Sequence, residues 1–340
     1  MDRGSLLRLP AAMALLLSGF AVLAGAQGIG VNYGMKGDNL PSPAAVVSLC
    51  KSRGIDKLRL FYPDTDALQA LAGSGISVIL GVFNEDLPQL AGDATFAVSW
   101  VHANVLPFAA DVSFRCIDVG NELIPGNSSA SVLPAMRNID AALQAAGVRI
   151  PVTTAISTVP LATSFPPSQG AFSDETVGYL NPILSFLATA GSPLLVNVYP
   201  FFAYSGSPGE VRLDYALFTA GGVVVQDGEL GYTNMFDAMV DSVRSAVERA
   251  GAPGLELVVS ETGWPSADDT GATVENAMIY VNNLVRHVNL KQGTPKCPGQ
   301  EMEVYLFAMF NEDEKPAGSE RNFGIFYPDM TEVYHVDFNS

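Results

Sequence analysis

The chain has 340 residues, of which 48% are hydrophobic and 16% are charged, and its formal net charge is −17. This hydrophobic content is enough for a large core and excludes an intrinsically disordered chain. The excess of acidic residues disfavours nucleic-acid binding, because contacts to phosphates need a basic face.

The first 26 residues have the pattern of a secretory signal peptide. Two early arginines precede a short apolar stretch that ends in Ala24-Gly25-Ala26, which matches a cleavage site. We therefore expect residues 1–26 to be removed and the mature chain, residues 27–340, to be secreted. A membrane anchor is the less favoured alternative, because a spanning helix needs about 20 apolar residues. No lipid-anchor signal is recognisable at the C-terminus.

Strand-like and helix-like patterns alternate along residues 27–340, with no linker between them. Such alternation favours a parallel sheet covered by helices. We predict one α/β domain over these residues, a (β/α)8 TIM barrel. The eight segments expected to be its strands are Ile29–Tyr33, Lys57–Phe61, Ile76–Val82, Arg115–Val119, Ile150–Ala155, Leu194–Tyr199, Leu257–Ser260 and Val304–Met309.

Two segments interrupt this alternation. Residues 205–232 contain two strand-like pieces, Val211–Phe218 and Val223–Gln226, joined by Gly221-Gly222. We expect a small hairpin-bearing insertion after the sixth strand, which would form one wall of a groove. Residues 157–172 contain three prolines and are expected to form a long loop at the rim of the barrel.

The cysteines and histidines do not suggest a metal centre. The three cysteines, Cys50, Cys116 and Cys297, are an odd number, and Cys116 lies in a predicted core strand, so we expect no disulfide. The three histidines are scattered and lack metal-ligand spacing. The glycines of residues 28–34 are misspaced for a dinucleotide-binding loop. We therefore expect no metal and no organic cofactor.

Two glutamates follow buried strands in the same way. Glu122 comes after Arg115–Val119, and Glu261 comes after Leu257-Val258-Val259. The carboxyl ends of barrel strands meet at one rim, so we expect these carboxylates to face each other there. Most glycoside hydrolases use two carboxyl groups that flank the bond to be cleaved, so two carboxylates at one rim are compatible with this reaction. Trp264 lies close to Glu261, and its flat ring suits a sugar face.

Two further polar residues accompany Glu122. Asp118 is an unusual charge inside a core strand, and alternation places it on the same side as Glu122. If buried it needs a partner, and Arg59 is the candidate. Asn127 begins an Asn-Ser-Ser acceptor sequence and is a candidate glycosylation site on the loop beyond Glu122.

The segments Val119–Glu122 and Ser260–Ser266 resemble the two signatures of the plant endo-β-1,3-glucanases, glycoside hydrolase family 17. The similarity continues in Ile29–Gly34, Leu58–Phe61, Asn197–Pro200, Phe307–Glu312 and Phe323–Pro328, so it spans about residues 29–338. One position departs from the family pattern, because Asp268 stands where the family usually has a small residue.

The resemblance implies a retaining enzyme that cleaves internal β-1,3-glucosidic bonds of β-glucans, a glucan endo-1,3-β-D-glucosidase. Glu122 is then the acid/base that donates the proton, and Glu261 is the nucleophile. The resemblance also implies that Glu312 and Lys315 line the cleft. A plant extracellular setting, in the apoplast or cell wall, and a role in defence or wall remodelling are further implications. We expect a monomer that binds polysaccharide and has no membrane anchor.

The remaining candidate residues for substrate binding come from their positions. Asn121 precedes the acid, and its amide is placed either to bind the 2-hydroxyl of the reacting sugar or to cap the following loop. Tyr33, Tyr199 and Phe202 lie at or beyond strand ends. These rings are expected to be sugar platforms, with packing at the top of the barrel as the alternative.

Two other functions remain open from the sequence. One is a β-1,3-1,4-glucanase on the same fold, since linkage choice lies in the walls of the cleft. The other is a wall-glucan-binding protein without turnover. The presence of both Glu122 and Glu261 argues against the second alternative.

Overall fold

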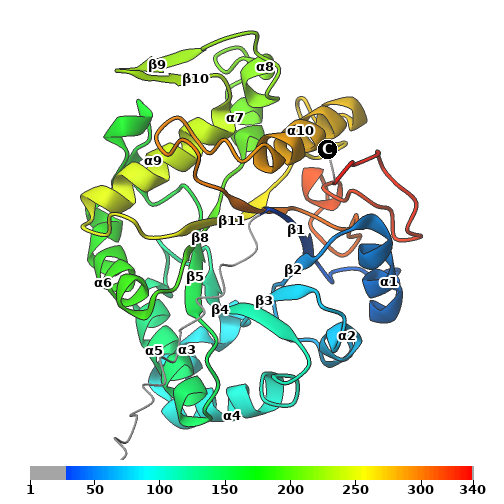
Figure 1. The fold of residues 1–340 in the computed structure, drawn as a ribbon, viewed down its shortest axis with the longest axis vertical. Helices are drawn as coiled ribbons and strands as arrows, with labels where there is room; N and C mark the ends of the chain where they lie inside the picture. Colours follow the sequence, from blue (N-terminus) through cyan, green and yellow to red (C-terminus); the bar gives the residue numbers. More distant parts are fainter. Residues whose placement is uncertain (1–27, 339–340) are drawn as a thin grey trace, which may run out of the picture.

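The computed structural model describes residues 28–338. Eight parallel strands close into a barrel in the order β1-β12-β11-β8-β5-β4-β3-β2, and helices surround it (Figure 1). The predicted (β/α)8 barrel and all eight predicted strands are confirmed. These strands are β1 Gly28–Tyr33, β2 Lys57–Leu60, β3 Ser77–Gly81, β4 Ser113–Asn121, β5 Val152–Ile156, β8 Leu194–Asn197, β11 Leu257–Thr262 and β12 Glu303–Leu306. The predicted signal peptide lies outside the described residues.

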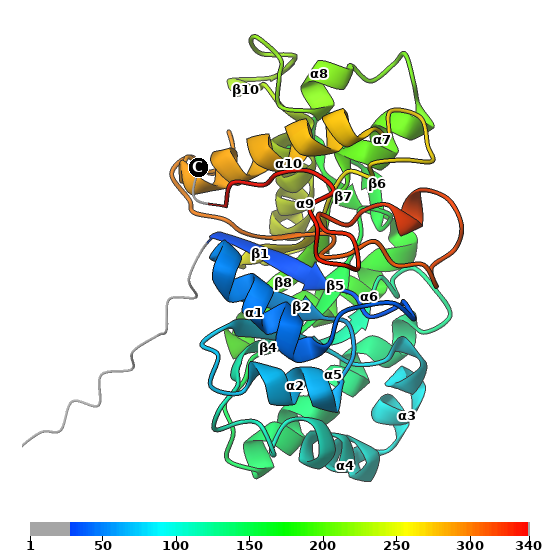
Figure 2. The same cartoon turned by 90° about the vertical axis from the view of Figure 1, so that its right-hand side faces the viewer.

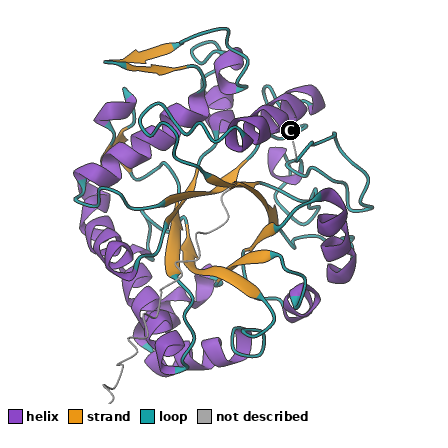
Figure 3. Cartoon of the chain, in the orientation of Figure 1, coloured by secondary structure: helices purple, strands orange, loops and turns teal. Residues whose placement is uncertain are grey.

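The helices lie on the outside of the strands (Figure 3). They are α1 Pro43–Arg53, α2 Thr65–Leu71, α3 Leu87–Gly92, α4 Ala94–Asn104, α5 Ser129–Ala145, α6 Asp174–Ala190, α7 Pro200–Gly206, α8 Leu213–Ala216, α9 Met235–Arg249 and α10 Val274–Asn289, with short 3-10 turns at Asn84–Asp86, Pro167–Gln169 and Ser319–Arg321. Side-chain caps fix the starts of several helices. The Asn234 side chain, for example, accepts a hydrogen bond from the Asp237 backbone and begins α9.

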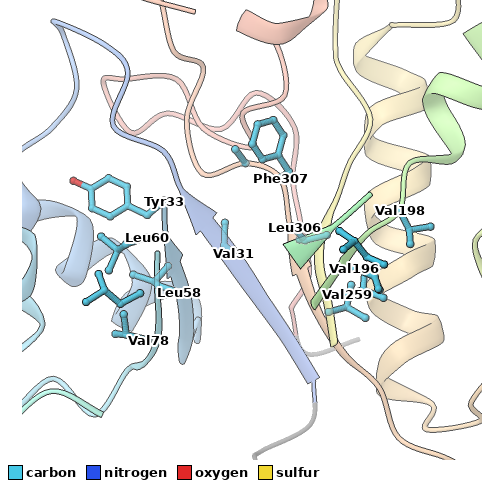
Figure 4. Packing of buried hydrophobic residues seen from close by; sticks show 14 of the residues in the cluster. Val31, Tyr33, Leu58, Leu60, Val78, Val196, Val198, Val259, Leu306 and Phe307 are labelled. Atoms are coloured by element: carbon cyan, nitrogen blue, oxygen red, sulfur yellow. The ribbon is translucent and has the colours of Figure 1, made fainter. Parts of the chain in front are cut away.

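The core has two layers separated by the barrel wall. Outward side chains such as Val31, Leu58 and Val259 pack against the helices (Figure 4). A smaller cluster fills the inside of the barrel and consists of Ile79, Cys116, Ala155, Leu195, Val258 and Tyr305. The barrel is therefore a packed core whose mouth carries the polar groups, as is usual for this architecture.

The insertion after β8 differs in detail from the prediction. Val211–Phe218 was expected to be a strand, but it contains the helix α8, which has Asp214 in its first turn. The hairpin lies further on, between β9 Val225–Asp227 and β10 Leu230–Tyr232, and projects from the barrel beside α8 (Figure 2). Its two-residue turn begins at Gly228, whose φ of 59° favours glycine.

The predicted rim loop at residues 157–172 also contains short strands that the sequence did not reveal. They are β6 Leu161–Thr163 and β7 Ala171–Phe172, which pair antiparallel. The three cysteines are free thiols, of which Cys50 and Cys116 are buried. In the described part of the chain, no helix combines the length and hydrophobicity that a membrane span requires.

Candidate active site

The two predicted catalytic glutamates each follow an irregularity in the pairing of their strand. On β11, Val259 pairs with Val196, but the next paired residue is Glu261, so one residue is extra. On β4, the pairing with β5 shifts between Asp118 and Asn121. A β-bulge re-aims the side chains beyond it. The strict alternation of inward and outward side chains along β4 and β11 therefore ends just before the mouth of the barrel.

The backbone at Glu122 is held in a conformation that is uncommon for a residue with a side chain. Its φ is 57°, in the left-handed region. The Glu122 N–H donates to Ala155 O at 2.9 Å, which ties this residue to the end of β5. Such strain persists only where surrounding structure enforces it, and it is typical of functional sites.

One amide lies between the two carboxylates. Asn197 Nδ2 donates to Glu122 Oε1 at 2.9 Å and to Glu261 Oε1 at 2.9 Å. Ser260 Oγ donates to Asn197 Oδ1 at 2.7 Å and so fixes the orientation of the amide. Because both carboxylate oxygens contact the same nitrogen, they lie within twice 2.9 Å of each other. The structure therefore brings Glu122 and Glu261 together at one rim.

Glu261 is buried and is held at both carboxylate oxygens. Arg59 Nη1 donates to Oε1 at 2.6 Å, and the Tyr199 hydroxyl donates to Oε2 at 2.8 Å. Arg59 Nη2 also pairs with Asp118 Oδ2 at 2.8 Å, which confirms the predicted partnership. Burial alone lowers the pKa of a guanidinium, but the two carboxylates outweigh it and hold the Arg59 pKa above its ordinary range. A permanent positive charge thus lies beside the predicted nucleophile.

Glu122 has a different environment. Its side chain is exposed at the mouth, yet the surrounding protein removes part of its hydration, and this raises the pKa of Glu122 above its ordinary value. The neighbouring charge of Glu261 raises the pKa further, whereas the hydrogen bond from Asn197 opposes the rise. A raised pKa suits a carboxyl group that must be protonated before it acts.

A groove of about 650 Å³ runs from Glu261 over the loops that follow β1, β2, β3 and β12. Asn121, Glu312 and Lys315 are among the residues that line it. Lys315 Nζ lies 3.1 Å from Glu312 Oε2 and 4.1 Å from the centre of the Phe307 ring. The predicted insertion after β8 contributes none of the described residues that line this groove.

The side chain of Asn121 belongs to the polar network of the site. Its Oδ1 accepts from Arg59 Nη2 at 2.9 Å and from Asn197 Nδ2 at 3.1 Å. Its backbone N–H and C=O form a reciprocal pair with the side chain of Asn84, at 2.9 and 3.0 Å. These contacts favour a role in the site over a simple cap of the following loop.

The predicted aromatic platforms divide into two groups. Tyr199 is half-buried above Glu261. The centroids of the Tyr199 and Phe202 rings lie 5.2 Å apart, and Phe202 is 45% exposed. Tyr33, by contrast, is 4% exposed, and Figure 4 shows it beside Leu60 on the outer side of the strands. The interpretation of Tyr33 as a sugar platform is therefore wrong. Its neighbour Asn32 points into the barrel, so alternation directs Tyr33 outward.

The interpretation of Trp264 as a sugar platform is also wrong. The residue is fully buried, and its ring packs against Phe201 with centroids 5.2 Å apart. Its Nε1 donates to Gly271 O at 2.9 Å. The ring of Trp264 is therefore not available to a sugar in the groove. Its packing on Phe201 and its bond to Gly271 stabilise the loop after Glu261.

This burial leads to a prediction about stability. Trp264→Ala is expected to lower the free energy of unfolding by about 3–5 kcal/mol, since it leaves a cavity in the core. Trp264→Phe keeps much of the ring but loses the bond to Gly271. It should lower the free energy of unfolding by only about 1 kcal/mol. Urea denaturation gives both values. A large rise in KM for β-glucan with unchanged stability would instead support the platform interpretation.

Some residues of the site were not found from the sequence. Asn197 carried a signal, because it is polar and follows the apolar run of β8 at the same rim. Glu320 carried none, since it lies in a short 3-10 turn, yet it lines the groove and its charge contributes to the raised pKa of Glu122. The bond from Arg59 to Glu261 depends on the bulge in β11 and was likewise not foreseen.

Two other predicted features lie at the edge of the site. Asn127 is exposed on the loop between β4 and α5, so it is accessible as a glycosylation candidate. Asp268, which departs from the family pattern, is exposed and accepts from Asn322 Nδ2 at 2.8 Å. Within residues 28–338, no cluster of His, Cys, Asp and Glu has the arrangement of a metal site.

Comparisons with known proteins agree with this geometry. The family model described as Glycosyl hydrolases family 17 matches residues 29–338. A Hordeum vulgare protein is 59% identical over 321 residues, which cover 94% of this chain and 99% of that protein. A Vitis vinifera protein named glucan endo-1,3-beta-glucosidase is 50% identical over 336 residues, which cover 96% of this chain and 97% of that protein.

A solved structure gives the same result for the fold. It is described as a beta-1,3-glucanase and allergen of Cryptomeria japonica pollen, and it superposes with a TM-score of 0.89. The two chains are 46% identical, and the match covers 92% of this chain and 99% of that one. With a family model over nearly all the described residues, and relatives that match at full length, the chain belongs to the glycosyl hydrolases of family 17.

Proposed function

We propose that the protein is a glucan endo-1,3-β-glucosidase that cleaves internal bonds with retention of configuration. The observation that carries the mechanism is the shared Asn197 amide, which holds Glu122 Oε1 and Glu261 Oε1 each at 2.9 Å. Retaining glycosidases hold their carboxyl groups about 5–5.5 Å apart, and inverting ones about 6.5–9.5 Å apart. The two oxygens lie within twice 2.9 Å of each other, and this bound supports the first class.

The reaction then has two steps. Glu122 donates its proton to the glycosidic oxygen while Glu261 attacks the anomeric carbon and forms a glycosyl-enzyme ester. Glu122, now ionised, removes a proton from the water that hydrolyses this ester. Arg59 and Tyr199 fix the direction of the Glu261 carboxylate by their bonds to its two oxygens. Both groups are in place before the substrate binds, as preorganised catalysis requires.

The shape of the site supports cleavage within a chain. The groove reaches over several loops on one side of the glutamates, and the exposed ring of Phe202 lies on the side of β8. Asn121, Tyr199, Phe202, Glu312 and Lys315 are the residues that we propose to contact the glucan. Two carboxylates and water suffice for the chemistry, so we propose no cofactor.

The raised pKa of Glu122 predicts the pH profile. Because the proton must be present for the first step, the alkaline limb of kcat/KM should lie above the ordinary glutamate pKa of about 4.3. Glu122→Gln cannot lose a proton in this range, so the limb should disappear from its residual activity. The profile is measured from pH 3 to 9 on a β-1,3-gluco-oligosaccharide, because its leaving group needs the proton. An unchanged limb in the variant would assign it to another group.

Linkage preference needs a direct comparison of substrates. We expect the purified protein to hydrolyse laminarin, a β-1,3-glucan, faster than a mixed-linkage β-1,3-1,4-glucan. The reverse order would establish the lichenase-type alternative on the same fold. Binding of laminarin without release of reducing ends would establish the non-catalytic alternative.

We also propose that residues 1–26 direct the chain into the secretory pathway and are removed, which leaves residues 27–340 as one monomeric catalytic domain in the apoplast or cell wall. The N-terminal sequence of the extracellular protein tests this directly, and it should begin at Gln27. Gel filtration tests the monomer. Mass loss on treatment with a glycosidase tests occupancy of Asn127.

A further inference from the structure

The guanidinium of Arg59 lies between two carboxylates inside the barrel. Its Nη1 lies 2.6 Å from Glu261 Oε1, and its Nη2 lies 2.8 Å from Asp118 Oδ2. Arg59, Asp118 and Glu261 are 0%, 2% and 6% exposed, so water and salt screen their charges only weakly. With both carboxylates ionised, one positive and two negative charges leave this group with a single net negative charge.

Further acceptors fix the plane of the guanidinium. Nη1 also donates to Ser260 O at 3.3 Å, and Nη2 also donates to Asn121 Oδ1 at 2.9 Å. Each terminal nitrogen therefore has two acceptors, and the group cannot turn without breaking several hydrogen bonds at once. Asp118 is thus joined to the predicted nucleophile through one rigid side chain.

The position of Asp118 is costly for stability. Burial raises the pKa of Asp118, and the charge and hydrogen bond of Arg59 oppose this rise. Replacement of a buried ion pair by apolar side chains is often neutral or stabilising. Arg59 also has Glu261 as a counter-charge, so the second carboxylate is not needed to neutralise it. This excess of negative charge points to a role in the reaction.

The reaction develops a positive charge close to this group. Cleavage of a glycoside passes through a transition state that resembles an oxocarbenium ion, with positive charge at the anomeric carbon. That carbon must lie beside Glu261, which attacks it. The charges of Arg59 and Glu261 alone would cancel. With Asp118 present, a net negative charge lies near the developing positive charge and stabilises the transition state more than the neutral substrate.

We propose that Asp118 is a positioning residue for the cleavage step and acts through Arg59. It holds the guanidinium against Glu261 and leaves the catalytic centre with a net negative charge. This inference rests on the proposed function. Asp118 is buried and is not among the described residues that line the groove. Its removal should therefore slow turnover and leave the binding of a neutral glucan unchanged.

The first test removes the charge of Asp118 and keeps its shape. Asp118→Asn retains an oxygen that can accept from Arg59, so we expect it to fold, and thermal unfolding checks this. At neutral pH it should lower kcat and kcat/KM for laminariheptaose together by about ten- to fiftyfold, with KM unchanged. Asp118→Ala, which removes the acceptor as well, should lose at least as much. Asp241→Asn removes another buried carboxylate, on α9, and is the matched control that should leave kcat unchanged.

A positively charged ligand distinguishes the effect of charge from a distorted site. Calorimetry gives the Kd of a β-1,3-linked glucosyl iminosugar, whose protonated ring nitrogen places a positive charge close to the position of the anomeric carbon. Asp118→Asn should raise this Kd about ten- to fiftyfold and leave KM for laminariheptaose unchanged. A distorted site would instead weaken the charged and the neutral ligand alike.

The outcomes separate this role from the proposed activity. Equal kcat values for folded Asp118→Asn and the parent protein would overturn the role of Asp118, as would an unchanged Kd for the iminosugar or a loss that appears only in KM. If the unsubstituted protein left laminarin intact, the proposed function would fail instead. The Kd of the iminosugar would then still decide whether the charge of Asp118 acts at the centre.

Discussion

Glu261→Ala is expected to lower the turnover of β-1,3-glucan by at least about 10⁴-fold, since no glycosyl-enzyme ester can form without the nucleophile. Removal of the side chain also leaves space on the α face of the anomeric carbon. Added azide should therefore attack there and yield an α-glycosyl azide from a substrate with a good leaving group. The rate is measured by release of reducing ends, and the azide product is identified by NMR.

The loss must be separated from a loss of folding. Arg59 retains its bond to Asp118 when Glu261 is removed, so we expect the variant to fold. Glu275→Ala, at an exposed position in the first turn of α10, is a control that should leave turnover unchanged. Near-normal hydrolysis by folded Glu261→Ala would place the nucleophile elsewhere.

Glu122→Ala should produce a defect that depends on the leaving group. The variant lacks the proton donor but keeps the nucleophile, so cleavage between two glucose units should fall by about 10²–10⁴-fold. An activated aryl glycoside needs little protonation, and formation of its ester should be largely spared. Steady-state rates on both kinds of substrate, with burst kinetics on the aryl glycoside, give the comparison.

Azide distinguishes this variant from the first. In Glu122→Ala the ester on Glu261 still forms, so azide should attack it from the β face and give the β-glycosyl azide. If the two variants gave the opposite azides, the roles of Glu122 and Glu261 would have to be exchanged. Equal losses on good and poor leaving groups would exclude proton donation by Glu122.

The interior of the barrel was largely predictable from the sequence, because alternation holds along its strands. Arg59 and Asp118 were expected to pair on that basis, and they do at 2.8 Å. The same rule places Asn32 inside and Tyr33 outside, so the error at Tyr33 came from considering only its position at a strand end. A position at the end of a strand does not by itself place a side chain in the mouth, because the alternation along the strand sets its direction.

The mouth itself was less predictable, because bulges and loops determine where its side chains point. The shift between Val259 and Glu261 brings Glu261 onto Arg59 and Asn197, and no sequence pattern marks it. Trp264 lies in a loop without periodicity, and only the folded chain shows that it is buried.

The most direct test of the proposed function is the configuration of the first product released from a β-1,3-glucan. NMR spectra recorded in the first minutes, before mutarotation, show which anomer the enzyme forms. If Glu122 and Glu261 act as acid/base and nucleophile, the new reducing end should appear first as the β anomer. An initial α anomer would mean inversion, and it would contradict the roles that we assign to the two glutamates.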